Sequence, residues 1–121
     1  MSIQLQIEEM PGYLAAKFTG AGVMEEICRH FELIAEHCKR ANKNKLLLDF
    51  MGASAADDSL GNRYFGAEKA GIFAFYNIKV AVAIRPELLD PQRFGETAIR
   101  NQWVNARVFI SIEDADEWLL K

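Results

Sequence analysis

The sequence predicts an α/β domain in which four helices cover a largely parallel, five-stranded sheet. Short apolar runs recur at residues 45–50, 78–84 and 106–110, and helix-like patterns lie between them. Continuous apolar runs suit strands that are buried on both faces, as in a parallel sheet. The regular alternation of strands and helices implies right-handed crossovers within one sheet.

Size and composition indicate one ordinary globular domain. The 121 residues suffice for a single hydrophobic core, so we expect residues 1–121 to form one domain. With 14 basic and 17 acidic side chains the net charge is −3, which disfavours a nucleic-acid or anionic-membrane surface for the domain as a whole. No apolar run reaches the roughly 18 residues of a membrane span, and the N-terminus lacks the pattern of a secretion signal. We therefore expect a cytoplasmic protein.

The first two strands are expected to form an antiparallel pair at the edge of the sheet. Ile3, Leu5 and Ile7 alternate with polar residues, as in a half-exposed strand. A Met-Pro-Gly turn at residues 10–12 leads into a second alternating run at residues 14–19. Because this connection is too short for a crossover helix, the two strands must run in opposite directions.

Residues 23–42 form the clearest predicted helix, with one apolar stripe along its length. Cys28 and Cys38 lie about 15 Å apart on such a helix, too far for a mutual disulfide, so we expect both to be reduced and buried. His30 and His37 are separated by about 11 Å, too far to bind one metal ion together.

A buried strand at residues 45–50 follows this helix and carries Asp49 near its end. The carboxyl end of a central strand in an α/β sheet is the usual place for a site. Residues 57–75 then form a less regular predicted helix, because three internal glycines weaken it.

The last part of the chain repeats the strand–helix pattern. After the strand at residues 78–84, Asp90-Pro91 supplies a capping carboxylate and a proline for the start of a helix that runs to about residue 103. After the strand at residues 106–110, Ser111 and Asp114 form a capping-box pattern that opens the final helix. The predicted order is ββαβαβαβα.

This order of elements resembles the STAS domains, and within them the SpoIIAA-like branch that includes bacterial anti-sigma-factor antagonists. Residues 46–61, LLLDFMGASAADDSLG, are similar to the family's strand, turn and phosphorylation loop. Residues 107–119, RVFISIEDADEWL, are similar to its closing strand and helix. The resemblance implies a SpoIIAA-like fold and a non-catalytic regulatory domain that binds a protein such as a kinase or an anti-sigma-like regulator.

The resemblance also implies candidate site residues. Asp49 matches the family's strand-end aspartate, and Ser59 falls on the serine that is phosphorylated in antagonists of this type. The pattern is degenerate, because Asp58 replaces the first serine, Leu60 the glycine and Met51 the turn serine. The candidate interaction loop around the candidate phosphosite Ser59 comprises Asp49, Gly52, Ser54, Asp57, Asp58, Ser59 and Arg63.

Two interpretations of Ser59 remain open. At the start of a helix, free N–H groups and the helix dipole favour an anion, and phosphorylation would add about −1.5 to −2 charges. Asp57 and Asp58 would repel that phosphate, however. In the other interpretation one of these aspartates caps the helix, and Ser59 is an ordinary first-turn residue.

Patterns typical of cofactor-dependent enzymes are incomplete. If Asp49 were a response-regulator phosphoacceptor, it would need neighbouring carboxylates for magnesium and a lysine, which the last strand lacks. We therefore expect Asp49 to organise its own turn. Gly20-Ala21-Gly22 resembles a dinucleotide loop, but Glu25 occupies the place of the third glycine and would oppose a pyrophosphate. We expect no enzyme activity, metal or cofactor.

Aromatic residues in and after the second predicted helix allow an alternative function. They could belong to the core, or they could form an exposed apolar patch that binds a partner, a second copy or a lipid-like ligand. SpoIIAA-like domains are similar in fold to CRAL-TRIO lipid-transfer domains, which admits a small-molecule binder. A small, aromatic-rich domain can also bury a patch against its copy, so we expect a homodimer. The candidate patch is Phe65, Ile72, Phe73, Phe75 and Tyr76.

Overall fold

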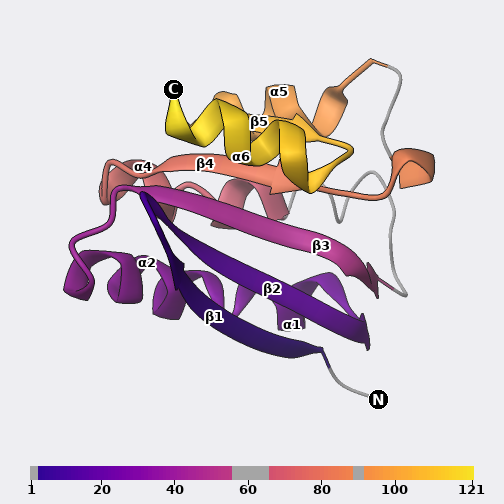
Figure 1. The fold of residues 1–121 in the computed structure, drawn as a ribbon. Coiled ribbons are helices and arrows are strands. Elements are labelled where there is room, and N and C mark those ends of the chain that lie inside the picture. Colours follow the sequence, from indigo (N-terminus) through magenta and orange to yellow (C-terminus); the bar gives the residue numbers. More distant parts are fainter. Residues whose placement is uncertain (1–2, 56–65, 89–91) are drawn as a thin grey trace.

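The computed structural model describes residues 3–55, 66–88 and 92–121 (Figure 1). Its strands are β1 (Gln4–Met10), β2 (Tyr13–Gly22), β3 (Lys45–Ala55), β4 (Lys79–Ala83) and β5 (Asn105–Phe109). Its helices are α1 (Met24–Cys28), α2 (Phe31–Arg40), α4 (Ile72–Phe75), the 3-10 turn η1 (Pro86–Leu88), α5 (Phe94–Arg100) and α6 (Ile112–Leu120). Residues 66–69 are also helical.

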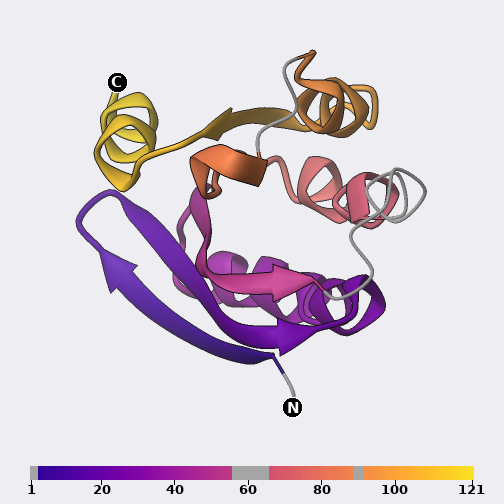
Figure 2. The ribbon, with the colours of Figure 1, turned by 90° about the vertical axis from the view of Figure 1, so that its right-hand side faces the viewer.

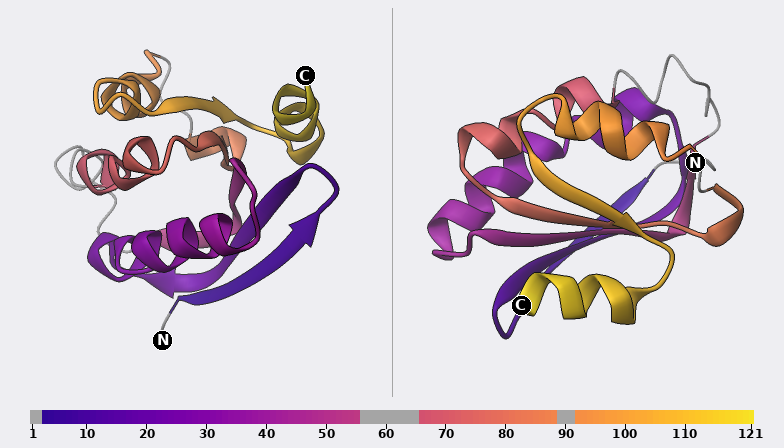
Figure 3. Two further views of the ribbon diagram at one scale, coloured as in Figure 1. Left: turned by 90° about the vertical axis from the view of Figure 1, so that its left-hand side faces the viewer. Right: turned by 90° about the horizontal axis from the view of Figure 1, so that it is seen from above.

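The sheet confirms the predicted topology. Its strand order is β1-β2-β3-β4-β5; β1 pairs with β2 in antiparallel fashion, and the other neighbours are parallel. Each crossover moves one place in the same direction, so right-handed connections put the intervening helices on one face. Among the described helices, α6, which follows the last strand, is the one that covers the other face (Figures 2 and 3).

Two cores of unequal size hold these layers together. The larger lies between the sheet and the crossover helices, and Phe18, Ile34 and Phe73 are fully buried in it. The smaller lies under α6, where Ala115 and Leu119 belong to one cluster with strand residues that include Leu47. Since each fully buried large apolar side chain contributes about 1.5–3 kcal/mol, the larger core supplies most of the hydrophobic stabilisation.

The prediction of one helix over residues 23–42 is wrong in one respect. This segment is broken at Arg29 and His30 into α1 and α2. The His30 N–H bonds to the Ile27 carbonyl oxygen at 3.2 Å, a short-range bond that tightens the turn. Neither glycine nor proline marks this break in the sequence. Cys28 and Cys38 are both buried and are not joined by a disulfide, as predicted.

The other predicted helices are shorter or more irregular than expected. The described part of the helix predicted at residues 57–75 consists of residues 66–69 and α4, separated at Gly71, where a glycine was expected to weaken it. The helix predicted to end at about residue 103 ends instead at Arg100. Its predicted start at Asp90-Pro91 lies outside the described residues. Among the described residues, no helix is long and apolar enough to cross a membrane.

A buried tyrosine joins the β1–β2 hairpin to the C-terminal helix. Tyr13 is 3% exposed, and its hydroxyl donates a 2.6 Å hydrogen bond to Asp116 Oδ1. Burial, together with this bond and the nearby carboxylates, raises the pKa of Tyr13 to about 12. The start of α6 is fixed separately by Ser111 Oγ, which accepts a hydrogen bond from the Asp114 N–H at 3.2 Å, as the capping pattern predicted.

An ion pair covers the outer edge of β5. Arg93 Nη2 lies 2.8 Å from Glu96 Oε2, which also accepts the Val108 N–H at 2.8 Å. Arg93 donates to the Val108 carbonyl oxygen as well, so both backbone groups of this edge residue have side-chain partners. An edge strand whose backbone groups are already bonded cannot pair with another chain at that point.

Replacing Tyr13 by Phe should lower the free energy of unfolding by about 1.5 kcal/mol at neutral pH, because the bond to a carboxylate is lost. The folded-state pKa of about 12 lies above the usual 10, so the neutral phenol stabilises the fold below pH 10. As the pH rises from about 10 to 12, the free energy of unfolding of the wild type should therefore fall by more than that of Tyr13→Phe. Urea unfolding at several pH values measures this; parallel pH profiles of the two proteins would contradict it.

Replacing Glu96 by Ala should destabilise the fold by about 1–3 kcal/mol, since the Val108 N–H loses its acceptor and Arg93 loses its carboxylate partner. Burial raises the pKa of the Glu96 carboxyl, but the bonds from Arg93 and Val108 outweigh it, so the pKa lies below its usual value. The carboxylate therefore stabilises the fold above its usual pKa, and that contribution is lost as the pH falls through the folded-state pKa. Acid unfolding of Glu96→Gln should show a weaker pH dependence than wild type.

Candidate functional site

Strand β3 runs further than the sequence predicted. It ends at Ala55 rather than near Phe50, and the segment from Gly52 to Ala55 pairs with β2. The loop expected to begin directly after Asp49 is therefore a strand extension. Small residues have a weak strand propensity, but the ladder offered by the ten-residue β2 overrides it here.

Asp49 lies at a bulge inside β3 and not at the end of the strand. Lys17 of β2 pairs with Asp49, but Thr19, two residues on, pairs with Gly52, so β3 contains one extra residue. Asp49 Oδ1 accepts a 2.9 Å hydrogen bond from the Met51 N–H within this bulge. The carboxylate thus organises the backbone two residues ahead, as expected, but in a strand.

Arg85 covers the far side of the β3 extension. β4 pairs with β3 only as far as Asp49, so no strand of the described residues pairs with the later part of β3 on that side. Arg85 Nη2 donates a 3.1 Å hydrogen bond to the Ala53 carbonyl oxygen, and Nε lies 3.6 Å from Glu87 Oε1. Arg85 therefore places a guanidinium at the carboxyl edge of the sheet, beside the strand that leads into the candidate loop.

Arg85 was not among the site residues predicted from the sequence. The signal that could have identified it is an arginine directly after a buried strand. That position lies at the carboxyl edge of the sheet, next to the strand that leads into the candidate loop. A guanidinium presents paired N–H donors that match carboxylate or phosphate oxygens. Arg85 is thus a described cation at this edge with the chemistry to bind an anionic group.

The candidate interaction loop is only partly described. Gly52 and Ser54 are exposed and Asp49 is half-buried. A Cβ at Gly52 would lie 3.2 Å from Thr19 Cγ2, so glycine permits the close approach of β2 and β3 there. The predicted residues outside the described ranges are Asp57, Asp58, Ser59 and Arg63.

Two features of the described residues bear on catalysis. Within residues 3–55, 66–88 and 92–121, no group of three His, Cys, Asp or Glu side chains could hold a metal ion. Burial raises the pKa of the Cys38 thiol to about 11, so this thiol is a poor nucleophile at neutral pH. What the carboxyl edge does present is a cation, a carboxylate and exposed strand backbone.

The aromatic candidates do not share one surface. Phe73 is fully buried, with its ring centroid 5.3 Å from that of Phe31, so it belongs to the core. Phe75 is 83% exposed, and Ile72 and Tyr76 are half-buried. Phe65 lies outside the described residues.

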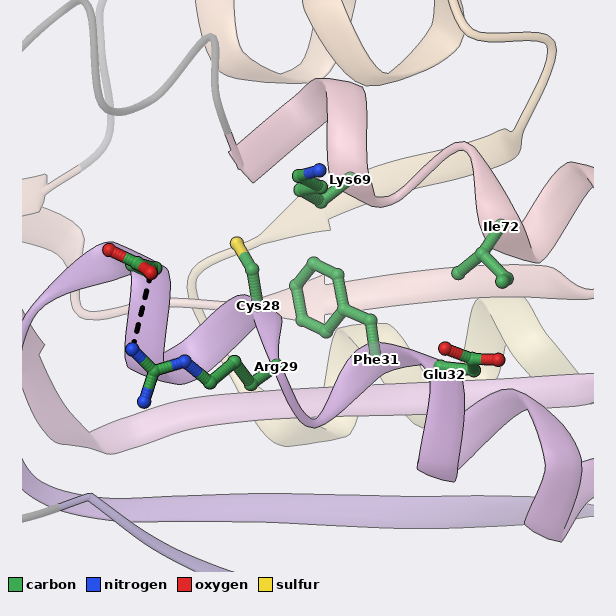
Figure 4. Close-up of a pocket in the computed structure, with 7 residues that line it drawn as sticks. Cys28, Arg29, Phe31, Glu32, Lys69 and Ile72 are labelled. Atoms are coloured by element: carbon green, nitrogen blue, oxygen red, sulfur yellow. Dashed lines mark hydrogen bonds and ion pairs between the residues drawn. The ribbon is translucent and has the colours of Figure 1, made fainter.

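A groove opens between the α1–α2 pair and the segment that holds Lys69 and Ile72 (Figure 4). Its volume is about 420 Å³. Phe31 and Ile72 give it apolar walls, and Glu25 and Arg29 form an ion pair of 3.2 Å at one end. The lining residues are Glu25, Cys28, Arg29, Phe31, Glu32, Lys69 and Ile72.

Comparisons with known proteins identify the fold. No protein-family model matches the chain, and no curated protein matches it significantly. Among solved structures, it is similar to an uncharacterised protein of the DUF3478 family from Shewanella loihica PV-4, which is described as having a SpoIIAA-like fold. The identity is 21% and the TM-score 0.57, over 98% of this chain and 94% of that one. The chain therefore has a SpoIIAA-like fold, as the sequence resemblance implied.

Proposed function

We propose that this protein is a cytoplasmic, non-catalytic regulatory domain from a bacterium that binds another protein through the carboxyl edge of its sheet. The observation that carries the proposal is Arg85, whose guanidinium is held beside the extended end of β3 by the Ala53 carbonyl oxygen. The fold supports a domain like the anti-sigma-factor antagonists. The partner would be a kinase or an anti-sigma-like regulator, as that resemblance implies.

The carboxyl edge offers a partner both charge and backbone. Beyond Asp49, β3 has no β4 residue beside it, and Ser54 is exposed. Strand backbone without a neighbouring strand can accept a segment of a partner, and an arginine beside it can select an acidic one. In this proposal the docking surface also includes Asp57, Asp58, Ser59 and Arg63. Phosphorylation of Ser59 then changes the charge of that surface.

Replacing Arg85 by Ala tests this proposal. Partner binding should weaken at least about tenfold, or about 1.4 kcal/mol, because the surface loses the guanidinium beside β3. The measurement is recovery of the partner on tagged protein from the source cells, followed by titration with the purified partner. Arg40→Ala is the matched control, since Arg40 is exposed at the far end of α2. Equal binding by wild type and Arg85→Ala, with both folded, would contradict the proposal.

A Ser59→Glu variant separates the regulatory part of the proposal from the docking part. If phosphorylation of Ser59 controls docking, the added charge should change partner affinity, and intact protein from cells should carry a phosphate on Ser59. If docking depends on Arg85 but no phosphate is found and Ser59→Glu binds normally, the surface is used without this switch.

The groove beside α2 supports a second candidate function, the binding of a small apolar ligand with a charged end. Its volume of about 420 Å³ falls in the range typical of small-molecule pockets. A native mass spectrum of the purified protein should then show a bound molecule. Ile72→Trp should remove it by filling the groove, while Leu33→Trp, on an exposed position of α2 outside the lining, should retain it. A spectrum without ligand would exclude this alternative.

Homodimerisation also stays a prediction. The exposed large apolar side chains of the described residues are scattered over α2, α4, α6 and the turns. No single one of these elements presents a continuous apolar face for a second copy.

A further inference from the structure

Three turns at the amino edge of the parallel strands share one backbone conformation. They connect α2 to β3, α4 to β4 and α5 to β5, and each contains one non-glycine residue with positive φ. In each turn the N–H of that residue bonds to the carbonyl three residues earlier, in Lys39, Ala74 and Arg100 respectively. The three residues are Asn42 (φ 58°), Asn77 (φ 54°) and Trp103 (φ 67°).

Trp103 is the exception among these equivalent positions. Asparagine tolerates the left-handed conformation, and two of the turns use it; a bulky side chain there is strained. The side chain of Trp103 is also 90% exposed, so packing within the domain does not offset the strain. A strained residue that also exposes a large apolar ring indicates a function for that ring.

Further exposed apolar side chains lie at the same edge. Phe75, at the end of α4, is 83% exposed. Its segment adjoins that of Trp103, since a Cβ at Gly71 would lie 3.6 Å from Gln102 Cβ. Leu120, at the end of α6, is 49% exposed. The end of α6 lies at this edge, because the Trp118 carbonyl oxygen accepts a hydrogen bond from Lys79 Nζ at the start of β4.

The three turns are basic, although the whole chain is acidic. Residues 37–45, 72–79 and 98–105 contain no aspartate or glutamate, whereas the net charge of the chain is −3. Acidic side chains occur on the flanking elements, among them Glu8 and Glu9 in β1, Glu36 in α2, which pairs with Arg40 at 3.8 Å, and Glu117 in α6. The basic residues of the turns are Lys39, Arg40, Lys43, Lys45, Lys79 and Arg100, and Lys121 follows α6.

The size of the apolar patch favours a membrane over a protein as the partner. A stable protein interface buries about 800 Å² on each side around an apolar core. Two aromatic side chains bury only about 150–250 Å² each. A lipid surface needs no pocket of matching shape, accepts tryptophan at the level of its headgroups and attracts clustered lysines and arginines when it is anionic.

We propose that the amino edge of the sheet docks on an anionic membrane surface, with Trp103 and Phe75 inserted among the headgroups and the surrounding basic side chains against lipid phosphates. The carboxyl edge, with Arg85, lies at the other end of the strands (Figure 1). A domain docked in this way keeps its carboxyl edge in solution. The inference therefore goes beyond the proposed function and does not depend on it.

Vesicle sedimentation with Trp103→Asn tests the inference. Wild-type protein should bind vesicles of phosphatidylglycerol and phosphatidylethanolamine, should not bind phosphatidylcholine vesicles, and should be released by salt. Trp103→Asn should reduce binding at least about tenfold, and Arg100→Glu should also reduce it. Leu33→Asn, which changes an exposed apolar side chain of α2, and Arg85→Ala should bind like wild type.

Stability and fluorescence separate docking from a structural role. Because asparagine suits the turn, Trp103→Asn should melt at or above the wild-type temperature while losing vesicle binding. Indole fluorescence of wild type should shift to shorter wavelength on anionic vesicles, and that shift should be absent in Trp103→Asn. Absence of vesicle binding, equal binding by both proteins or a marked loss of stability in Trp103→Asn would overturn the inference. Trp103-dependent binding of single-stranded DNA without vesicle binding would also overturn it.

Discussion

The arrangement of this protein depends on one constraint, the stepwise order of its parallel strands. From β2 to β5 every crossover moves to the next strand in the same direction, so right-handed connections place all crossover helices on one face. Within the part of the chain that the structure describes, the other face is covered by α6, which packs on β3, β4 and β5. Removing α6 would expose the smaller core. The hydrogen bond from Tyr13 to Asp116 also attaches α6 to the β1–β2 hairpin.

The same constraint separates two chemically different edges. All parallel strands begin at one edge and end at the other, so the helix-to-strand turns gather at the amino edge. That edge holds the basic residues of three turns and the exposed Trp103. The carboxyl edge holds Asp49, the extension of β3 and Arg85. If one partner bound at each edge, this chain of 121 residues would hold the two partners close together.

Much of the fold follows from local patterns in the sequence. The alternation around Ile3, Leu5 and Ile7 marks β1 because side chains of a strand point alternately to its two faces. The run Leu46–Leu48 marks β3 as a strand buried on both faces, and all three leucines are buried. Ser111 marks the start of α6 because its hydroxyl can accept a backbone N–H there. These signals act over a few residues, so a sequence displays them directly.

Tertiary structure decided the features that depend on contacts between segments distant in the chain. Gly52 and Ser54 form strand because β2 lies alongside, and the bulge at Asp49 appears only when the two strands are paired. Arg85 reaches Ala53 across 32 positions of sequence, which no local pattern encodes. Trp103 looked like the end of a helix, and its strained, exposed position became visible only in the folded turn. The sequence by itself determined the five strands and the order in which strands and helices alternate. The packing of those elements determined both candidate surfaces, because each surface combines side chains from segments that only the sheet brings together.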